Sequence, residues 1–226
     1  MSRYWKDSIT LLLTGTCDSR CPHCAVKGMR TRTHMGIEVL EENIFSSIRP
    51  HHDVAICGGE PTIHPKFEPV ILGLLRKTDK VAVITNGACV STAEKAKEFF
   101  RFLTDNPELA VIFSADTQHE EGVPGFKERL ERLLEAHERF RIGFKVTERS
   151  AVECEGTTRR LGLPPNRTIT SALWEEERLT AFGTERRVFI AETGDVHACM
   201  SNYLSGTPPI GSVIKTALSE VLRNID

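Results

Sequence analysis

The chain has 226 residues, 40% of them hydrophobic, a composition typical of a globular protein that can bury a full core. Its 29 basic and 31 acidic side chains nearly balance, so we expect neither a nucleic acid nor a membrane as a partner. The apolar run at 9–13 is too short for a signal peptide or a membrane-spanning helix, and we therefore expect a soluble cytoplasmic protein.

Apolar strand patterns alternate with amphipathic helix patterns along most of the chain. The expected strands are 8–14, 53–57, 80–85, 109–115, 141–147 and 167–171, and the expected helices are 37–48, 67–77, 91–103, 126–140 and 152–161. Such alternation is typical of parallel strands that are buried on both faces and joined by right-handed crossovers. Six units are fewer than the eight of a closed barrel. The sequence therefore predicts an α/β fold, a partial (β/α)6 barrel over residues 1–173.

The pattern changes in the last part of the chain, and we treat 174–226 as a smaller C-terminal unit. The sequence RRVFIAETGDVHACMS (186–201) predicts two short strands joined by a turn at Thr193 and Gly194. A loop and a final helix follow. This hairpin and helix are expected to cap the mouth of the barrel.

Three of the seven cysteines lie close together in the sequence TGTCDSRCPHC (14–24). At their spacing, Cys17, Cys21 and Cys24 can hold a [4Fe–4S] cluster by three of its irons, which leaves the fourth iron open. A zinc site completed by His23 or by a distant cysteine is the alternative. A zinc ribbon would usually show a second closely spaced pair of ligands, and the sequence has none. Three of the other cysteines, taken singly, are more typical of small buried hydrophobic residues: Cys57, Cys89 and Cys154.

Further motifs follow the other expected strands. The sequence GGEPTIHP (58–65) comes directly after the second strand, and glycines there would let backbone groups approach a ligand closely. An ordinary tight turn would also explain a single glycine pair. TNG (85–87) and SAD (114–116) follow the third and fourth strands. Ligands of open α/β sheets bind at the carboxyl ends of the strands. We therefore expect these motifs to lie together with the cysteine loop at that edge of the sheet.

The ordered set CDSRCPHC, GGEP, TNG and FSAD resembles the radical S-adenosylmethionine (radical SAM) superfamily over roughly residues 8–150. The resemblance implies that Cys17, Cys21 and Cys24 bind one [4Fe–4S] cluster. It also implies that the amino and carboxylate groups of S-adenosylmethionine (SAM) chelate the open iron. The implied reaction is reductive cleavage of SAM to a 5′-deoxyadenosyl radical, which abstracts a hydrogen atom from a substrate.

The resemblance assigns expected roles to further residues. His23 occupies the position that passes close to adenine, although a solvent-exposed loop histidine is an equal reading. Gly58, Gly59 and Glu60 match the segment that binds the SAM amino group, and Glu60 could instead brace the loop. The remaining candidates for contacts with SAM or substrate are Asn86, Ser114, Asp116 and Lys145. For Lys145, a side chain that snorkels at the strand end is the alternative.

The C-terminal unit resembles the opening of a SPASM or twitch extension, in which a cysteine at the position of Cys199 helps to hold an auxiliary cluster. No cysteine follows Cys199, and Cys154 is the only other one beyond the first four units, so we expect a single cluster per chain. Cys199 is then either a buried thiol or a hydrogen-atom donor to the substrate radical, as in radical SAM epimerases.

The leading functional hypothesis is a radical SAM enzyme that acts on a peptide or small-molecule substrate. An external one-electron reductant such as flavodoxin or ferredoxin is its expected partner. Epimerisation is one of several net reactions that begin with hydrogen abstraction. An activating enzyme of a glycyl radical protein is an alternative, and so, outside enzymes, is a passive iron–sulfur or zinc binding module.

Overall fold

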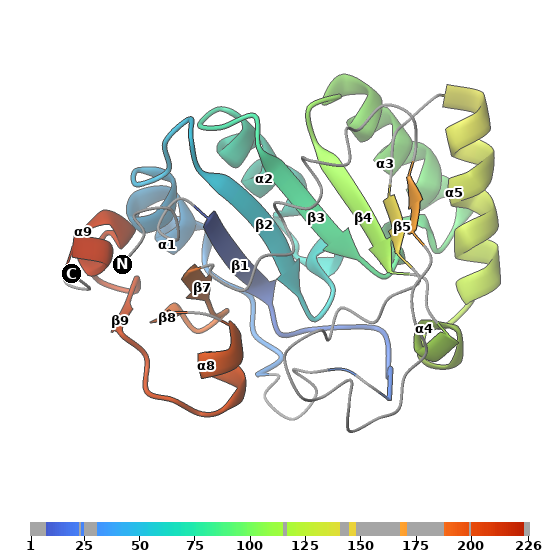
Figure 1. The fold of residues 1–226 in the computed structure, drawn as a ribbon. Helices are drawn as coiled ribbons and strands as arrows, with labels where there is room; N and C mark the ends of the chain where they lie inside the picture. Colours follow the sequence, from blue (N-terminus) through green and yellow to red (C-terminus); the bar gives the residue numbers. More distant parts are fainter. Residues whose placement is uncertain are drawn as a thin grey trace.

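The computed structural model describes residues 8–22, 24, 31–114, 117–140, 145–147, 168–170, 188–198 and 200–223. Nine strands in these residues form one sheet in the order β6-β5-β4-β3-β2-β1-β7-β8-β9 (Figure 1). The strands are β1 (Ser8–Thr14), β2 (Asp53–Gly58), β3 (Val81–Thr85), β4 (Ala110–Ser114), β5 (Lys145–Thr147), β6 (Thr168–Thr170), β7 (Val188–Ile190), β8 (Asp195–His197) and β9 (Gly211–Ser212). Strands β1 to β5 are parallel, and β7 is parallel to β1 on its other side. The predicted α/β fold with an open barrel is therefore confirmed.

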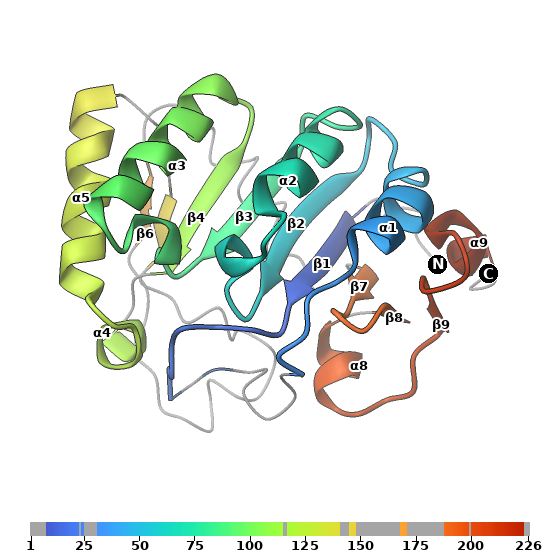
Figure 2. The same cartoon turned by 180° about the vertical axis from the view of Figure 1, so that it is seen from behind.

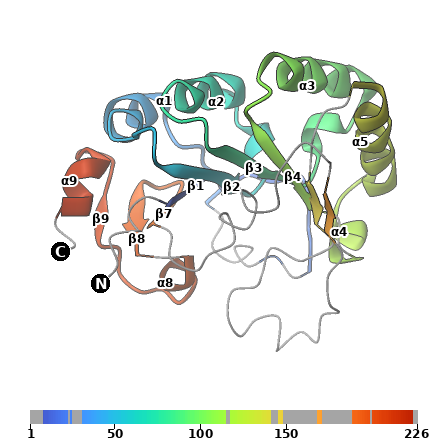
Figure 3. The ribbon, with the colours of Figure 1, turned by 45° about the horizontal axis from the view of Figure 1, so that its top comes forward.

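Helices cover one face of this sheet. Figures 2 and 3 show α1, α2, α3 and α5 side by side on its outer, convex face. The helices are α1 (Ile37–Val39), which continues as a π-helical segment (Leu40–Phe45), α2 (Phe67–Leu75), α3 (Ala93–Asp105), α4 (Thr117–Gly122), α5 (Phe126–Phe140), α8 (Met200–Leu204) and α9 (Leu218–Arg223). Helices were predicted at the positions of α1, α2, α3 and α5. Within the described ranges, no helix is both long and apolar enough to cross a membrane.

The start of α3 illustrates how local sequence sets a helix boundary. The side chain of Thr92 accepts a hydrogen bond of 3.3 Å from the backbone N–H of Lys95, which the helix itself leaves without a partner. The apolar residues of the helix then recur on one side and bury Phe99 and Leu103 against the sheet.

Side chains alternate between the two faces of the sheet. In β1, Leu11 joins the core under the helices, whereas Leu12 packs with Phe189 of β7 on the opposite face, which we call the inner face. In β3 and β4 the inner-face positions include Ala82 and Ala110. Ile84 and Ile112 follow them on the same face toward the ends of these strands, so the middle of the inner face is apolar.

The predicted C-terminal hairpin is confirmed, and it belongs to the barrel sheet. Strand β7 pairs with β1 in parallel, with Val188 opposite Ile9, and β8 returns antiparallel to β7. The two C-terminal helices lie in different places. Helix α8 lies on the side where β1 to β4 end (Figure 1). Helix α9 contacts the residues that follow the π-helical segment, where Ser219 N donates to Ser47 Oγ at 3.0 Å. Of these two, α8 is thus the helix at the mouth of the barrel, and it was not predicted.

Two other expectations differ from the structure. The sixth strand pairs antiparallel to β5, with Ile169 opposite Val146, so it does not continue the series of parallel units. Residues 117–122, expected as a loop, form helix α4. The helix expected at 152–161 lies outside the described residues, as does the start of the strand expected at 141–147.

Candidate active site

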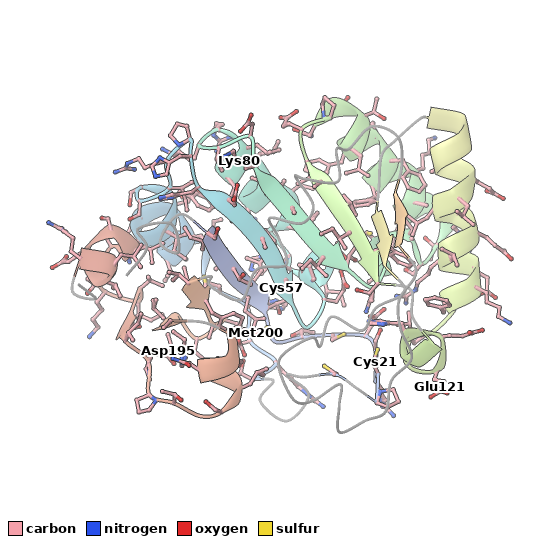
Figure 4. All side chains as sticks on the ribbon, in the orientation of Figure 1. Cys21, Cys57, Lys80, Glu121, Asp195 and Met200 are labelled. Carbon is pink, nitrogen blue, oxygen red and sulfur yellow. The ribbon has the colours of Figure 1, made fainter. Side chains whose placement is uncertain are left out.

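The three clustered cysteines lie on the segment that leaves the carboxyl end of β1. In Figure 1 this segment runs along the lower side of the molecule, where β1 to β4 end, between α8 and α4. Cys21 is 5% exposed, and Cys17 and Cys24 are half-buried. Figure 4 shows Cys21 beside α4. The cysteines therefore lie on the side of the sheet where the sequence predicted a ligand.

Helix α4 packs directly on the cysteine segment. The backbone N–H of Arg20 donates to the carbonyl oxygen of Gly122 at 2.8 Å. A Cβ atom on Gly122 would collide with the backbone of Cys21, well inside the 3.0 Å that real Cβ atoms keep. Gly122 is therefore required for this close approach.

The glycines of GGEP let two loops of the protein approach one another. Gly59 N donates to Thr14 O at 2.6 Å, and Glu60 N donates to Thr16 O at 2.8 Å. A Cβ atom on Gly58 would lie 2.5 Å from Thr14 O, and one on Gly59 would collide with Thr16 O. The sequence suggested that these glycines admit a ligand. In the structure, what approaches them is the backbone that leads into the cysteines.

The side chain of Glu60 supports the contact between the GGEP turn and the cysteine segment. Its side chain is 1% exposed, and its carboxylate accepts hydrogen bonds from Thr62 N (3.0 Å), Thr62 Oγ1 (2.6 Å), Thr85 Oγ1 (2.7 Å) and Asn86 N (2.7 Å). Burial raises the pKa of Glu60, and the hydrogen bonds from these groups oppose that shift. The alternative that Glu60 braces the loop has direct support in these contacts, which join the ends of β2 and β3.

Asn86, at the end of β3, connects to the cysteine segment. Its Nδ2 lies 2.7 Å from Ser19 Oγ, 2.9 Å from Asp18 Oδ1 and 3.7 Å from Cys17 Sγ. Its Oδ1 accepts from Ala88 N at 3.0 Å. These contacts engage both ends of the amide, so a contact between Asn86 and SAM would have to replace one of them.

A buried arginine on α5 completes this network, and sequence reasoning missed it. Arg129 is 3% exposed; its Nη2 donates to Asp18 Oδ2 at 2.7 Å and its Nη1 donates to Asn86 Oδ1 at 3.1 Å. Burial alone would raise the pKa of Asp18, but hydrogen bonds from Arg129 and Asn86 and the arginine charge outweigh it, and the pKa is lowered. The ion pair between Asp18 and Arg129 is therefore held in its charged form.

The donor set of the cysteine segment fits a cluster held by three cysteines. Among the residues the structure describes, no three His, Cys, Asp or Glu side chains converge as ligands of one ion would. The thiolates of a [4Fe–4S] cluster bind separate irons and stand farther apart. Cys17 Sγ accepts a hydrogen bond of 3.4 Å from Ser19 N besides the contact with Asn86, and such bonds stabilise negative charge on a ligating sulfur. Three thiols in this setting fit a cluster held by three cysteines.

Aromatic side chains gather on the inner face near the end of β2. Tyr203 of α8 lies 4.8 Å from Phe189 and 5.3 Å from His197 between ring centroids. Cys57 and Met200 pack against the same group, and Figure 4 shows both at the centre of the molecule. Burial, together with nearby negative groups, raises the pKa of Tyr203 to about 12. This aromatic group borders the inner face beside the GGEP turn.

Glu192, directly after β7 and Ala191, is a second buried carboxylate that the sequence did not single out. It is 4% exposed, and Thr31 Oγ1 donates to its Oε1 at 2.9 Å. Its Oε2 is buried and has no hydrogen-bond partner among the described residues. A Cβ atom on Gly15 would lie 2.9 Å from Oε1, so this carboxylate lies against the start of the cysteine segment.

The other predicted site residues are placed as follows. Ser114 is buried at the end of β4, and Lys145 begins β5 opposite Ile112 of β4. Cys57 and Cys89, expected as small buried hydrophobic residues, are half-buried and pack against apolar side chains, and burial raises the pKa of the Cys89 thiol. Four residues lie outside the part of the chain that the structure describes: His23, Asp116, Cys154 and Cys199.

A comparison with protein-family models matches residues 11–152 to the radical SAM superfamily. The matched range begins within β1 and includes the cysteine segment, GGEP, Asn86 and Arg129. No curated protein matches the sequence significantly.

Solved structures share the fold. Streptococcus suis SuiB bound to S-adenosylmethionine superposes with a TM-score of 0.65 at 13% identity, covering 96% of this chain and 65% of SuiB. AnSMEcpe with bound AdoMet and Cp18Cys peptide gives 0.61 at 16% identity, covering 95% and 79%. BtrN in complex with AdoMet and 2-DOIA gives 0.61 at 13% identity, covering 100% and 85%. The chain thus spans slightly less than two thirds of the length of SuiB.

Proposed function

Because the chain belongs to the radical SAM superfamily, we propose that it is an enzyme that binds one [4Fe–4S] cluster through Cys17, Cys21 and Cys24, and SAM beside it. When bound by these cysteines, the cluster would supply the electron for reductive cleavage of SAM, the chemistry that would make hydrogen abstraction from a substrate possible. An external one-electron reductant such as flavodoxin or ferredoxin would deliver the electron.

One observation carries this proposal more than any other. The GGEP turn and the cysteine segment are joined by two backbone hydrogen bonds, from Gly59 to Thr14 and from Glu60 to Thr16. The two motifs that mark the family therefore form one unit at the carboxyl ends of β1 and β2. A cofactor bound there would touch both the thiolates and the inner face of the sheet.

The chain's own residues would hold and orient the cofactors. Gly58, Gly59 and the backbone of the turn would bind the amino group of SAM, while Glu60 keeps the turn in place through its four hydrogen bonds.

Ser114, at the end of β4, would contact the ribose or the substrate. His23, Asp116 and Lys145 remain candidates from the sequence for adenine, ribose and carboxylate contacts.

We propose that the substrate is a peptide or a small molecule that binds along the inner face. The aromatic group around Tyr203 supports this location, because it lies on that face near the end of β2. The second carboxylate oxygen of Glu192 would accept a hydrogen bond from a donor of the substrate. Solved relatives of the fold are described with precursor peptide SuiA or with Cp18Cys peptide, which is consistent with a peptide.

The test is anaerobic reconstitution of the full chain, followed by addition of dithionite and SAM. We expect about four iron atoms per chain and the formation of 5′-deoxyadenosine. An intact cluster that yields no 5′-deoxyadenosine would favour a passive iron–sulfur module. Zinc in place of iron after purification without added metal would favour a zinc-stabilised module. An activating enzyme of a glycyl radical protein would cleave SAM and also generate a radical on a large partner protein.

A further inference from the structure

Arg129 of α5 is a buried cation that contacts both the cysteine segment and the residue that follows β3. Its guanidinium contacts two residues that are distant in sequence, Asp18 at 2.7 Å and Asn86 at 3.1 Å. Asp18 directly follows Cys17, and Asn86 directly follows β3. Burying a guanidinium this deeply is costly unless its partners keep good geometry. The side chain of Arg129 therefore restrains both partners.

Arg129 and the backbone N–H of Ala88 together fix which way the Asn86 amide faces. A guanidinium can only donate hydrogen bonds, and Ala88 N donates to the same atom of Asn86 at 3.0 Å. The atom between these two donors must be Oδ1, the acceptor. The Nδ2 group then necessarily faces the cysteine segment, where it lies 3.7 Å from Cys17 Sγ.

The sulfur of Cys17 thus receives N–H groups from two directions, Asn86 Nδ2 and Ser19 N at 3.4 Å. Ser19 is itself held, since its Oγ donates to Asp18 Oδ1 at 3.0 Å and lies 2.7 Å from Asn86 Nδ2. Hydrogen bonds to a ligating sulfur favour the reduced, more negative cluster and so raise its reduction potential. A nearby cation acts in the same direction and a nearby anion in the opposite one.

We propose that Arg129 is a positioning residue that turns Asn86 toward Cys17 and, together with Asp18, sets the reduction potential of the cluster that Cys17 helps to bind. This inference rests on the proposed function, because it needs a cluster on these cysteines. The residue acts through Asn86 and Asp18, the two side chains to which it donates.

Helix α5 offers a matched control. Arg132 lies one turn after Arg129, and its Nη1 donates to Val90 O at 2.9 Å and Ser91 O at 3.0 Å. Both arginines tie α5 to the segment after β3. Arg129 also reaches the cysteine segment. Arg132→Met therefore removes a comparable anchor of α5 and leaves the contacts with Asp18 and Asn86 in place.

The experiment compares reconstituted wild type with Arg129→Met, Arg129→Lys, Asp18→Asn and Arg132→Met, all without SAM. Iron content and thermal unfolding are measured first, and the midpoint potential is then measured by redox titration followed by electron paramagnetic resonance. We expect the potential of Arg129→Met to become more negative and that of Asp18→Asn to become less negative. Arg129→Lys should shift in the direction of Arg129→Met by a smaller amount, because an ammonium group keeps the charge but cannot bond both partners. Arg132→Met should match wild type.

The opposite signs separate a tuning role from a merely structural one, which would disturb the potential in the same direction in both variants. Equal potentials in wild type, Arg129→Met and Asp18→Asn overturn the inference, and so do shifts of the same sign. If Arg129→Met fails to bind iron, the other two variants decide. In that case the inference is overturned when Arg129→Lys and Asp18→Asn both have the same midpoint potential as wild type. A wild type that assembles a cluster and cleaves SAM while the variants show no shift refutes only this inference. A wild type that assembles no cluster refutes the proposed function as well.

Discussion

The carboxylate of Glu60, at the end of β2, accepts a 2.7 Å hydrogen bond from the backbone N–H of Asn86, at the end of β3. The same carboxylate also accepts hydrogen bonds from the hydroxyl and the backbone N–H of Thr62 and from the hydroxyl of Thr85. Every partner of this carboxylate is a donor. A single buried side chain therefore sets the spacing of two strand ends under the cysteine segment.

Glu60→Gln is expected to destabilise the fold, because an amide N–H₂ group would face a donor in place of one carboxylate oxygen. A buried donor left without an acceptor costs about 1–3 kcal/mol. Chemical denaturation measures the free energy of unfolding, and Glu68→Gln, at an exposed position of α2, is the control. Equal stability of the Glu60 and Glu68 variants would contradict the bracing role.

Replacing any one of Cys17, Cys21 or Cys24 by Ala is expected to reduce bound iron to background and to abolish SAM cleavage. Three thiolates are already fewer than the four that usually hold such a cluster. Cys89→Ala is the control, because Cys89 is half-buried and packs against the core. A variant of the three that keeps full iron content and activity would remove that cysteine from the ligand set.

Gly59→Ala is expected to lower stability by about 1–3 kcal/mol, the usual cost of overpacking, and to reduce iron incorporation along with SAM binding. Its added methyl group would meet Thr16 O, on the segment that carries Cys17. Gly36→Ala is the control, since a methyl group there would come no closer than 3.3 Å to any neighbour. Normal cluster assembly with weakened SAM binding alone would instead mean that the glycine serves only the cofactor.

The role of Cys199 can be tested by running the reaction in deuterated water with wild type and Cys199→Ser. If the thiol returns a hydrogen atom to the substrate radical, wild type places deuterium in the product and the variant fails to complete turnover. Thiol hydrogens exchange with solvent, which is why the label reports on the donor. Unchanged turnover in the variant, with no deuterium in the wild-type product, leaves Cys199 as a buried thiol.

His197 is expected to make the fold sensitive to acid. Burial lowers its pKa from the ordinary value of 6.5, against the opposing effects of Asp195 and the Thr207 backbone. The unfolded chain therefore binds the proton more readily, and stability is lost as the pH falls below about 6.5 toward the folded pKa. Relative to His197→Gln, wild type should lose at most about 1.4 kcal/mol per pH unit in that window. Denaturation curves at several pH values measure this, and parallel profiles for the two proteins would rule it out.

Local pattern was sufficient for much of the fold. The continuous apolar run at 9–13 predicted a strand buried on both faces, and Leu11 and Leu12 do pack on opposite faces of β1. The turn at Gly194 marked the hairpin. Strand direction is a different matter. Ile169 pairs antiparallel with Val146, and no property of a three-residue strand specifies which way it runs beside its neighbour. Helix α4 has six residues, too few for a helical period to show in the sequence.

The sequence by itself determined the chemistry that we propose for the candidate site, because its clustered thiols and the GGEP turn are short motifs whose residues are neighbours in the chain. Only the tertiary structure decided what surrounds them. Arg129 lies 111 positions from Asp18 and 43 from Asn86, on a helix whose many charged residues look alike in sequence. Packing of α5 against the strand ends buries this one arginine, and burial makes its two hydrogen bonds strong. The residues that we propose as ligands could be identified from their spacing in the sequence, whereas the residues that position them depend on contacts between distant elements.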